Sequence, residues 1–332
     1  MNAKKRVLSG TQPTGRLHLG HLVGALDNYV ALQNDHDCFY CVVDWHALTS
    51  MYADTSQLQN YILEVVAGYL AAGVDPETST IFIQSDVKEH AELHLLLSML
   101  TPLGWLERVP TYKEKKQQMQ DRDLSNYGFL GYPVLQTADI ILYKAHLVPV
   151  GEDQLFHLEL AREIVRRFHH MYNATVFPEP EAKLTEAKRV PGLDGRKMSK
   201  SYDNSIYLED DEKTITQKIS TMLTDTRRKR RTDPGEPEDC PVFALHKIFS
   251  TREEQAACAE GCRSAGIGCF DCKKVLLNHI LETVLPVGER IRALKNDRPY
   301  LQDVLRDGAV KAREVAAATM DEVRTVMNLK NM

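Results

Sequence analysis

Two separated motifs carry side chains that suit phosphate chemistry. In residues 10–21 (GTQPTGRLHLGH), glycines let a phosphate approach the backbone, and His18 and His21 add donors on one helical face. In residues 197–201 (KMSKS), two lysines can meet the negative charge that develops on phosphate in a transition state. Each motif alone also has an ordinary interpretation, as surface histidines at a helix start and as a solvated basic loop.

The cysteines suggest a second kind of chemistry, because five of them fall between residues 240 and 272. In a reducing compartment such clustering favours metal ligation over disulfides. The pattern Cys240-x21-Cys262-x6-Cys269-x2-Cys272 contains one close pair, and its spacing leaves Zn²⁺ and a [4Fe–4S] cluster equally open. Cys258, one helical turn before Cys262, is either a core thiol or an alternative ligand.

The elements that must position the first motif are those of an α/β domain. Short apolar runs alternate with segments of helical periodicity, which indicates βαβ units and a mostly parallel sheet. Such a sheet binds ligands beyond the carboxyl ends of its strands. Cys38 and Cys41 fall in one apolar strand and are expected in the core. The predicted strands are residues 6–9, 38–43 and 80–83, and the predicted helices are about 19–33, 56–72, 90–100 and 152–172.

The character of the sequence changes after Ser201, where long helical stretches replace strands. The fold class is therefore predicted as α/β: a Rossmann-like parallel-sheet nucleotide-binding domain at residues 1–205, followed by an all-helical domain at residues 206–332. The helical part contains a basic run at residues 227–231 (RRKRR). That run is either a solvated segment or a patch that contacts nucleic-acid phosphates.

Composition agrees with two soluble domains. The 332 residues are 43% hydrophobic and 26% charged, which argues against a disordered, collagenous or coiled-coil chain. The formal charge of -5 gives no global sign of nucleic-acid binding, so any such binding must be local. No apolar run approaches the roughly 18 residues of a membrane span, and no secretory signal is recognisable. We therefore expect a cytoplasmic protein that does not bind membranes.

The two motifs in this order resemble the paired signature of class I aminoacyl-tRNA synthetases. Further stretches are similar to bacterial tryptophanyl-tRNA synthetases over nearly the whole chain, and most similar to the subgroup that carries an iron–sulfur cluster. These stretches are residues 10–15, Asp44-Trp45-His46, Tyr132-Pro133, Ala138-Asp139-Ile140 and residues 150–154 (VGEDQ). The resemblance implies that L-tryptophan is activated with ATP and Mg²⁺ and transferred to tRNA(Trp) by a homodimer.

Two rival functions stay open at this point. Residues 132–136 (YPVLQ) with the following Asp139 also resemble archaeal-type tyrosyl-tRNA synthetases. A catalytically inactive paralogue that only grips RNA would share the fold, but it predicts a broken motif pair, whereas both motifs are intact.

The resemblance assigns the ATP-handling residues. The catalytic side chains would be His18, His21, Lys197 and Lys200, with Lys115 and its neighbour Lys113 in a second loop that could close over the pyrophosphate. For those last two lysines, a solvated helix face is an equally good interpretation. The ATP-binding residues would be Gln12, Pro13, Thr14, Gly20, His21, Gly151, Glu152, Asp153, Val190, Lys197, Met198, Ser199, Lys200 and Ser201.

The resemblance also places the tryptophan pocket and the metal. Asp139 would accept the indole N–H, although from the residues alone an N-cap role is preferred for it. The other pocket residues would be Tyr132, Gln136, His46 and Gln154, and Gln136 replaces an apolar residue of other bacterial members. The family pattern favours a [4Fe–4S] cluster over Zn²⁺ at Cys240, Cys262, Cys269 and Cys272. The first spacing is one residue shorter than the family pattern.

Overall fold

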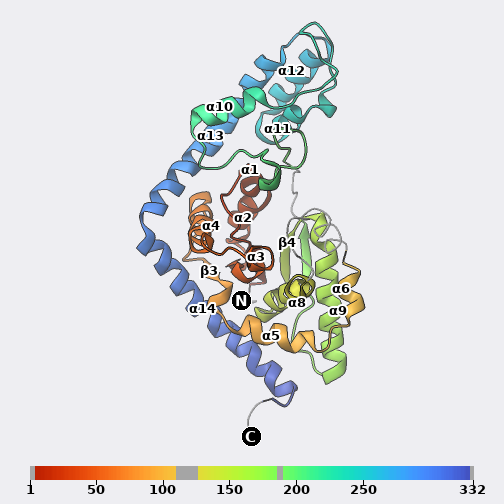
Figure 1. The fold of residues 1–332 in the computed structure, drawn as a ribbon, viewed down its shortest axis with the longest axis vertical. Coiled ribbons are helices and arrows are strands. Elements are labelled where there is room, and N and C mark those ends of the chain that lie inside the picture. The colour runs from red at the N-terminus through yellow and green to blue at the C-terminus, as the bar shows by residue number, and fades with distance from the viewer. Residues whose placement is uncertain (1–3, 110–125, 185–189, 330–332) are drawn as a thin grey trace. The chain divides into compact units, whose positions relative to one another are not determined.

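The computed structural model describes residues 4–109, 126–184 and 190–329, and the chain forms two compact units. The first, here called the sheet unit, comprises Met1–Gly15, Asn28–Thr185 and Asp297–Met332. The second, the helical unit, comprises Arg16–Asp27 and Glu186–Asn296. Figure 1 colours these segments by their order in the chain.

A five-stranded parallel sheet organises the sheet unit, as the alternation of apolar and helical segments predicted. The strand order is β3-β2-β1-β4-β5, so the chain runs outward from β1 to β3 and then returns to the other side of β1. Val7 of β1 pairs with both Cys38 of β2 and Leu147 of β4. The strands are β1 (Arg6–Thr11), β2 (Asp37–Val42), β3 (Ser79–Ile83), β4 (Leu147–Val150) and β5 (Glu181–Leu184).

The first three strands were predicted, but the helix Asp44–Met51 after the second of them was not. Cys38 and Cys41 are buried in the core as expected. The predicted helix at residues 56–72 ends at Gly73, whose φ of 107° is a left-handed cap that suits glycine. The last two strands were missed because they have four residues each, and β5 carries exposed Glu181. The helices of this unit are α3 (Asp44–Met51), α4 (Leu58–Ala72), α5 (Glu89–Ser98), α6 (Leu103–Glu107), α8 (Tyr127–Leu142), α9 (Leu155–Tyr172) and α14 (Arg298–Val326).

The C-terminal helix α14 packs on the sheet unit, so the predicted division at residues 205 and 206 differs from the compact units. Figure 1 shows α14 passing beside β3 and α5. A Cβ atom at Gly308 would lie 1.8 Å from the carbonyl oxygen of Ile81, which means that helix and strand backbones touch there. Arg324 also pairs with Glu92 of α5 at 2.6 Å. Small residues along α14 therefore let the end of the chain return to the sheet.

The helical unit contains the segment that follows β1 as well as residues after 185. Backbone hydrogen bonds join them, from Leu19 N to Ile206 O at 2.8 Å and from Leu208 N to Leu17 O at 3.0 Å. Its elements are α1 (Leu19–His21), a π-helix (Leu22–Leu26), the first residue of α2 (Asp27–Leu32), α10 (Glu212–Thr221), α11 (Pro241–Phe249), α12 (Arg252–Arg263) and α13 (Cys269–Asn296), with short 3-10 turns at Lys200–Tyr202 and Pro237–Asp239. None of the described helices of the chain is long and apolar enough to cross a membrane.

Candidate active site

A buried carboxylate, Asp139, lies in the interior of α8 with 3% of its surface exposed. Nε2 of His46 is 2.8 Å from its Oδ2, and Nδ1 of His90 is 2.7 Å from its Oδ1. Nε2 of Gln84 lies within 3.0 Å of both oxygens. An ionised carboxylate only accepts hydrogen bonds, so all three side chains donate to Asp139.

The donors of Asp139 are themselves oriented. Oε1 of Gln84 accepts the backbone N–H of Trp45 at 3.1 Å, which turns the amide nitrogen toward the carboxylate. His90 donates through Nδ1, and its Nε2 is 2.8 Å from the Tyr143 hydroxyl, which fixes the ring from its other side. Gln84 follows β3, and α3 with His46 follows β2, so the ends of two neighbouring parallel strands bring these donors together.

Burial raises the pKa of Asp139, but the hydrogen bonds from His46 and His90 outweigh it and hold the pKa well below the usual range. The group therefore stays ionised in an apolar surrounding. Such a charge is retained only when it is fully supported by donors, as it is here. A buried, oriented acceptor of this kind can select for a substrate that carries one donor.

The predicted pocket residues gather around this carboxylate in part. His46 contacts Asp139 directly, and its ring lies 6.3 Å from that of Tyr132. Tyr132 is buried, with its hydroxyl 3.2 Å from Nε2 of His157. Gln136 is half-buried on α8, and Gln154 is half-buried just before α9. The N-cap interpretation of Asp139 is wrong, because α8 begins at Tyr127.

Gln84, His90 and Tyr143 were not predicted as site residues. Each is fully buried and polar, which is the signal that could have found them had the helices been known. They are 55, 49 and 4 residues from Asp139 along the chain, and only the fold brings the first two to it.

The loops after β1 and β4 flank the point where the strand order reverses. These strands are neighbours in the sheet, and residues 12–14 follow one while residues 151–154 follow the other. Gly15, which closes the first loop, has a φ of 114°. A crevice outside the carboxyl ends of strands at such a reversal is the usual ligand site of parallel sheets. The predicted ATP residues Gln12, Pro13, Thr14, Gly151, Glu152 and Asp153 thus occupy the expected loops of the sheet unit.

In the helical unit, the histidines of the first phosphate motif lie near the lysines of the second. Nδ1 of His18 accepts Gly20 N–H at 3.1 Å, and Nδ1 of His21 accepts His18 N–H at 3.1 Å. Both rings therefore keep Nε2 as the N–H donor. A Cβ at Gly20 would meet the His18 ring at 3.0 Å, so glycine lets that ring cover the helix start. Burial, followed by the charges of Lys200 and Lys197, lowers the pKa of His18 to about 4.

The lysine motif is organised by a residue that the sequence did not reveal. Asn204, 2% exposed, accepts Ser199 N–H at 2.8 Å and donates to Lys197 O at 3.2 Å and to Asp194 Oδ1 at 2.7 Å. Met198 is buried, Lys200 is half-buried and Lys197 is exposed. The loop is thus anchored by Asn204 between its two lysines. The remaining predicted residues of this unit are Val190, which is buried, and Ser201, which is exposed; Lys113 and Lys115 lie outside the described residues.

Replacing His18 with asparagine tests the neutrality of the histidine pair. Asparagine caps a helix as well as histidine does here but does not titrate. Because the folded pKa is about 4 and the ordinary value is 6.5, the unfolded chain binds the extra proton first. Stability from neutral His18 is complete above pH 6.5 and is lost as the pH falls toward 4. Between pH 7 and pH 5 the wild type should lose about 2 kcal/mol more than His18→Asn in urea unfolding; equal losses would contradict this.

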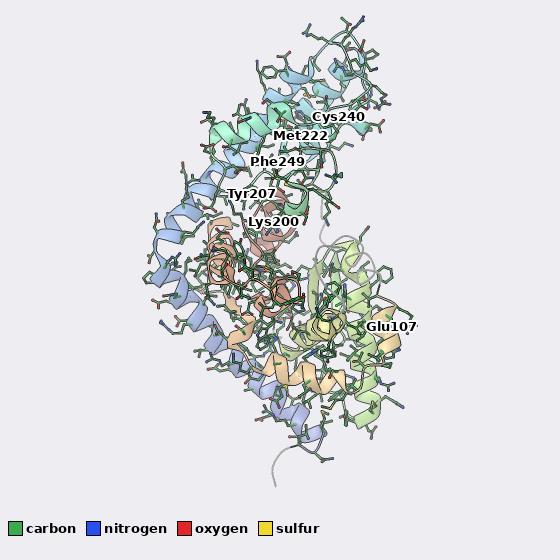
Figure 2. The ribbon with its side chains drawn as sticks, in the orientation of Figure 1. Glu107, Lys200, Tyr207, Met222, Cys240 and Phe249 are labelled. Carbon is green, nitrogen blue, oxygen red and sulfur yellow. The ribbon has the colours of Figure 1, made fainter. Side chains whose placement is uncertain are left out.

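The predicted metal ligands come from the helices of the helical unit. Cys240 caps α11, Cys262 lies on α12, and Cys269 and Cys272 lie in the first turn of α13. Figure 2 places Cys240 apart from Lys200, which belongs to the phosphate motif. Burial, with smaller effects of neighbouring thiols, raises the pKa values of Cys262 and Cys272. A metal would therefore have to displace protons from these thiols.

Part of the basic run at residues 227–231 contacts the cysteine-rich region. Nη1 of Arg228 is 3.7 Å from the Cys262 sulfur, and Nη2 donates to Ile267 O at 3.0 Å. Arg227 is paired with Asp225 at 3.0 Å and with Asp239 at 2.6 Å. The run is therefore not uniformly solvated, and Lys229, Arg230 and Arg231 are its remaining members. Arg230 and Arg231 are exposed.

Comparison with known proteins gives consistent relatives. A family model described as tRNA synthetases class I (W and Y) matches residues 1–284. The chain is 56% identical over 326 residues to a protein of Thermotoga maritima named tryptophan–tRNA ligase, covering 98% of this chain and 99% of the relative. It is 46% identical to the protein of that name from Deinococcus radiodurans, covering 96% and 97% of the two chains.

A solved structure supports the same fold. The tryptophanyl-tRNA synthetase of Campylobacter jejuni, complexed with ADP and tryptophan, superposes with a TM-score of 0.86 at 36% identity. The match covers 98% of this chain and the whole of the other. The parallel sheet, the helices around it and the helical region after residue 200 are thus those of that structure's fold.

Proposed function

The chain belongs to the class I tRNA synthetases of the tryptophan and tyrosine family, and from this premise we propose which of its residues carry each part of the reaction. Its activity is that of a tryptophan–tRNA ligase: ATP, with Mg²⁺, activates L-tryptophan to the adenylate, and the amino acid is then transferred to tRNA. This activity decides against the tyrosine enzyme and against an inactive RNA-binding paralogue, which were the two alternatives.

Asp139 reads the indole N–H of tryptophan in this proposal. The observation that carries it is a buried, ionised carboxylate whose three donors fix its orientation. Gln84 contacts both carboxylate oxygens, and in this proposal the indole N–H joins these donors at Asp139. Tyr132 and His46 supply ring surfaces beside it, and we assign Gln136 and Gln154 to the rest of the pocket. A side chain without an N–H, such as phenylalanine, would leave this acceptor unmatched at a cost of roughly 1–3 kcal/mol.

The sheet unit would hold the nucleoside side of ATP. Gln12, Pro13 and Thr14 follow β1, and Gly151 to Asp153 follow β4, next to the reversal in strand order. We assign the first loop to the lining of the ATP site and the second to the ribose. Val190 is assigned to the adenine. Positioning is the main catalytic contribution here, because in-line attack of a carboxylate on the α-phosphorus needs little covalent help.

The helical unit would supply the charge for the leaving pyrophosphate. His18 and His21 keep neutral rings with Nε2–H groups as donors, and Lys197 and Lys200 bring positive charge beside them. Gly20 and the residues Met198, Ser199 and Ser201 complete the two motifs. Because charge grows on the pyrophosphate as the bond breaks, these groups bind the transition state more strongly than ATP. Lys115, with Lys113, is assigned a supporting role in the same step.

For the cysteines, we propose a [4Fe–4S] cluster at Cys240, Cys262, Cys269 and Cys272, with Zn²⁺ as the alternative. Two observations support a bound group. Arg228 places a positive charge 3.7 Å from the Cys262 sulfur, which suits an anionic thiolate centre. A Cβ at Gly235 would lie 2.8 Å from that sulfur, so glycine leaves room beside it. The group would brace the helices that we assign to anticodon recognition.

Replacing Cys269 with serine tests that assignment. The variant should lose the broad absorbance near roughly 400 nm of cysteine-ligated iron–sulfur clusters. It should also charge tRNA more slowly while tryptophan-dependent pyrophosphate exchange stays nearly intact, because activation does not use these helices. Cys258→Ser is the matched control and should keep the absorbance. A colourless wild type with stoichiometric zinc after anaerobic purification would refute the cluster, and lost exchange would show that the site supports the whole fold.

The remaining partners follow from the family. We propose a homodimer in the cytoplasm that binds tRNA(Trp), with exposed Arg230 and Arg231 near its phosphates. Sedimentation of the purified chain tests the dimer. Replacing both arginines with alanine should weaken tRNA binding and make it less dependent on salt. Each phosphate contact that is lost lowers the slope of log affinity against log salt concentration. An unchanged salt slope would remove them from the tRNA surface.

A further inference from the structure

Three potential metal ligands, two of which belong to no set assigned above, come together in the helical unit. They are His246 on α11, Cys258 on α12 and Cys272 on α13, and their ligand atoms all lie within 4.8 Å of one another. His246 and Cys258 are 0% and 3% exposed. Of the four proposed cluster ligands, only Cys272 belongs to this group, which was not recognised from the sequence.

The distances suit one ion of zinc size. Zinc–sulfur bonds of about 2.3 Å and zinc–nitrogen bonds of about 2.0–2.1 Å place the ligands of a tetrahedral ion roughly 3.5–3.8 Å apart. Nε2 of His246 is 3.3 Å from the Cys272 sulfur, and the largest separation in the group is within 4.8 Å. Closing the group around one ion thus needs shifts of about 1 Å, whereas a four-iron cluster, which is larger, would need its sulfurs spread apart.

His246 has the second hydrogen bond that orients a typical metal-ligating histidine. Nδ1 of His246 is 2.7 Å from Oγ of Ser250, at the end of the same helix. A hydroxyl can accept the Nδ1–H, which leaves the Nε2 lone pair facing Cys272. The Cys272 carbonyl lies 3.2 Å from the same Nε2 and accepts its N–H in the other tautomer. The ring can therefore switch from a hydrogen bond to a metal bond without turning.

The group of three whose ligand atoms lie within 4.8 Å of one another does not include Cys262, which we take as the fourth ligand from its position on α12. Cys262 follows Cys258 by four residues, so both side chains project from one side of the helix on consecutive turns. Buried structural zinc sites are closed by four ligands, commonly three cysteines and one histidine. The set His246, Cys258, Cys262 and Cys272 meets that rule in number and type.

We propose that His246, Cys258, Cys262 and Cys272 form a second ligand set that binds one soft divalent ion such as Zn²⁺. This set shares Cys262 and Cys272 with the proposed cluster, so the chain holds either the ion or the cluster. The ion site rests on its own geometry, and only the mutual exclusion rests on the proposed cluster. Two private residues distinguish each set: His246 and Cys258 for the ion, Cys240 and Cys269 for the cluster.

Cobalt(II) titration of the full-length chain, after metal removal under anaerobic conditions, tests the proposal. A tetrahedral thiolate site gives Co²⁺ a near-ultraviolet charge-transfer band and visible d–d bands, and Zn²⁺ should displace it. Cys258→Ser and His246→Gln should weaken binding at least about tenfold, and Ser250→Ala about tenfold through the lost orientation of the ring. Cys240→Ser and Cys269→Ser are the matched controls and should bind Co²⁺ like the wild type.

A conservative exchange separates ligand loss from misfolding. His246→Cys keeps a ligand at the site, so it should still bind Co²⁺ and should give a stronger charge-transfer band from an additional thiolate. The proposal is overturned if Cys240→Ser or Cys269→Ser abolishes binding while Cys258→Ser leaves it unchanged, or if the wild-type chain shows no tetrahedral cobalt spectrum. If iron–sulfur reconstitution of the Zn²⁺-loaded chain leaves the zinc in place, mutual exclusion fails while the activity assignment is untouched.

Discussion

Replacing Lys200 with alanine should lower the rate of tryptophan activation by about 10²- to 10³-fold while the affinity for ATP changes only a few-fold. The ammonium group lies in a loop anchored by Asn204 and lowers the pKa of His18, so its charge is felt at the motif that would face the phosphates. In the ground state, Mg²⁺ already neutralises part of the negative charge of ATP. The leaving pyrophosphate gains further negative charge as the bond to the α-phosphorus breaks. The lysine therefore stabilises the transition state selectively.

Pre-steady-state measurement of adenylate formation separates these effects, because it yields the rate constant and the ATP dissociation constant independently. Lys213→Ala, at an exposed position on α10, is the matched control and should behave like the wild type. Collapse of ATP affinity with an unchanged rate constant would remove Lys200 from the transition state and make it a ground-state ligand.

Replacing Asp139 with alanine should reduce the preference for tryptophan over phenylalanine by roughly 10- to 100-fold, with a smaller loss in Asp139→Asn. Asparagine can still turn its carbonyl oxygen to the indole N–H, whereas alanine offers no acceptor. The alanine variant should also unfold more easily, because His46, His90 and Gln84 lose their shared partner in a buried place.

The ratio of kcat/KM for the two amino acids in pyrophosphate exchange reports this selectivity independently of the amount of folded enzyme. Asp303→Ala, at an exposed position of α14 in the same unit, controls for the loss of a carboxylate. Selectivity equal to that of the wild type in Asp139→Ala would place the indole acceptor on another residue.

Local patterns predicted those parts of the fold that depend on nearby residues. Three such features depend only on a few consecutive residues. They are the strand at residues 6–9, the end of a helix at Gly73 and the helix start within residues 10–21. The helix α8 was missed because Pro133 lies inside it and its residues are apolar almost all round, which hides the helical period. Tertiary burial, which a local pattern does not contain, stabilises that helix.

Long-range contacts explain what was missed in the site. His46 and Asp139 are 93 residues apart, and Arg324 and Glu92 are 232 apart, so neither pair leaves a local signature. The packing of α14 on the sheet does leave a local signature. Small buried residues recur along this helix, namely Gly308, Ala309, Ala312 and Ala316. The cysteine spacing predicted metal chemistry, but His246 belongs to another helix, and only the fold brings it to Cys258.

Tryptophan-dependent pyrophosphate exchange by the wild type, compared with the same reaction on the benzothiophene analogue of tryptophan, tests the central claim most directly. The analogue keeps the size and aromatic surface of the indole but replaces its N–H with sulfur. Because the buried Asp139 is ionised and already oriented by three donors, we predict that kcat/KM for the analogue is about 10- to 100-fold lower than for tryptophan. Equal kcat/KM values for the two would contradict the claim that a carboxylate in α8 selects the substrate by its N–H.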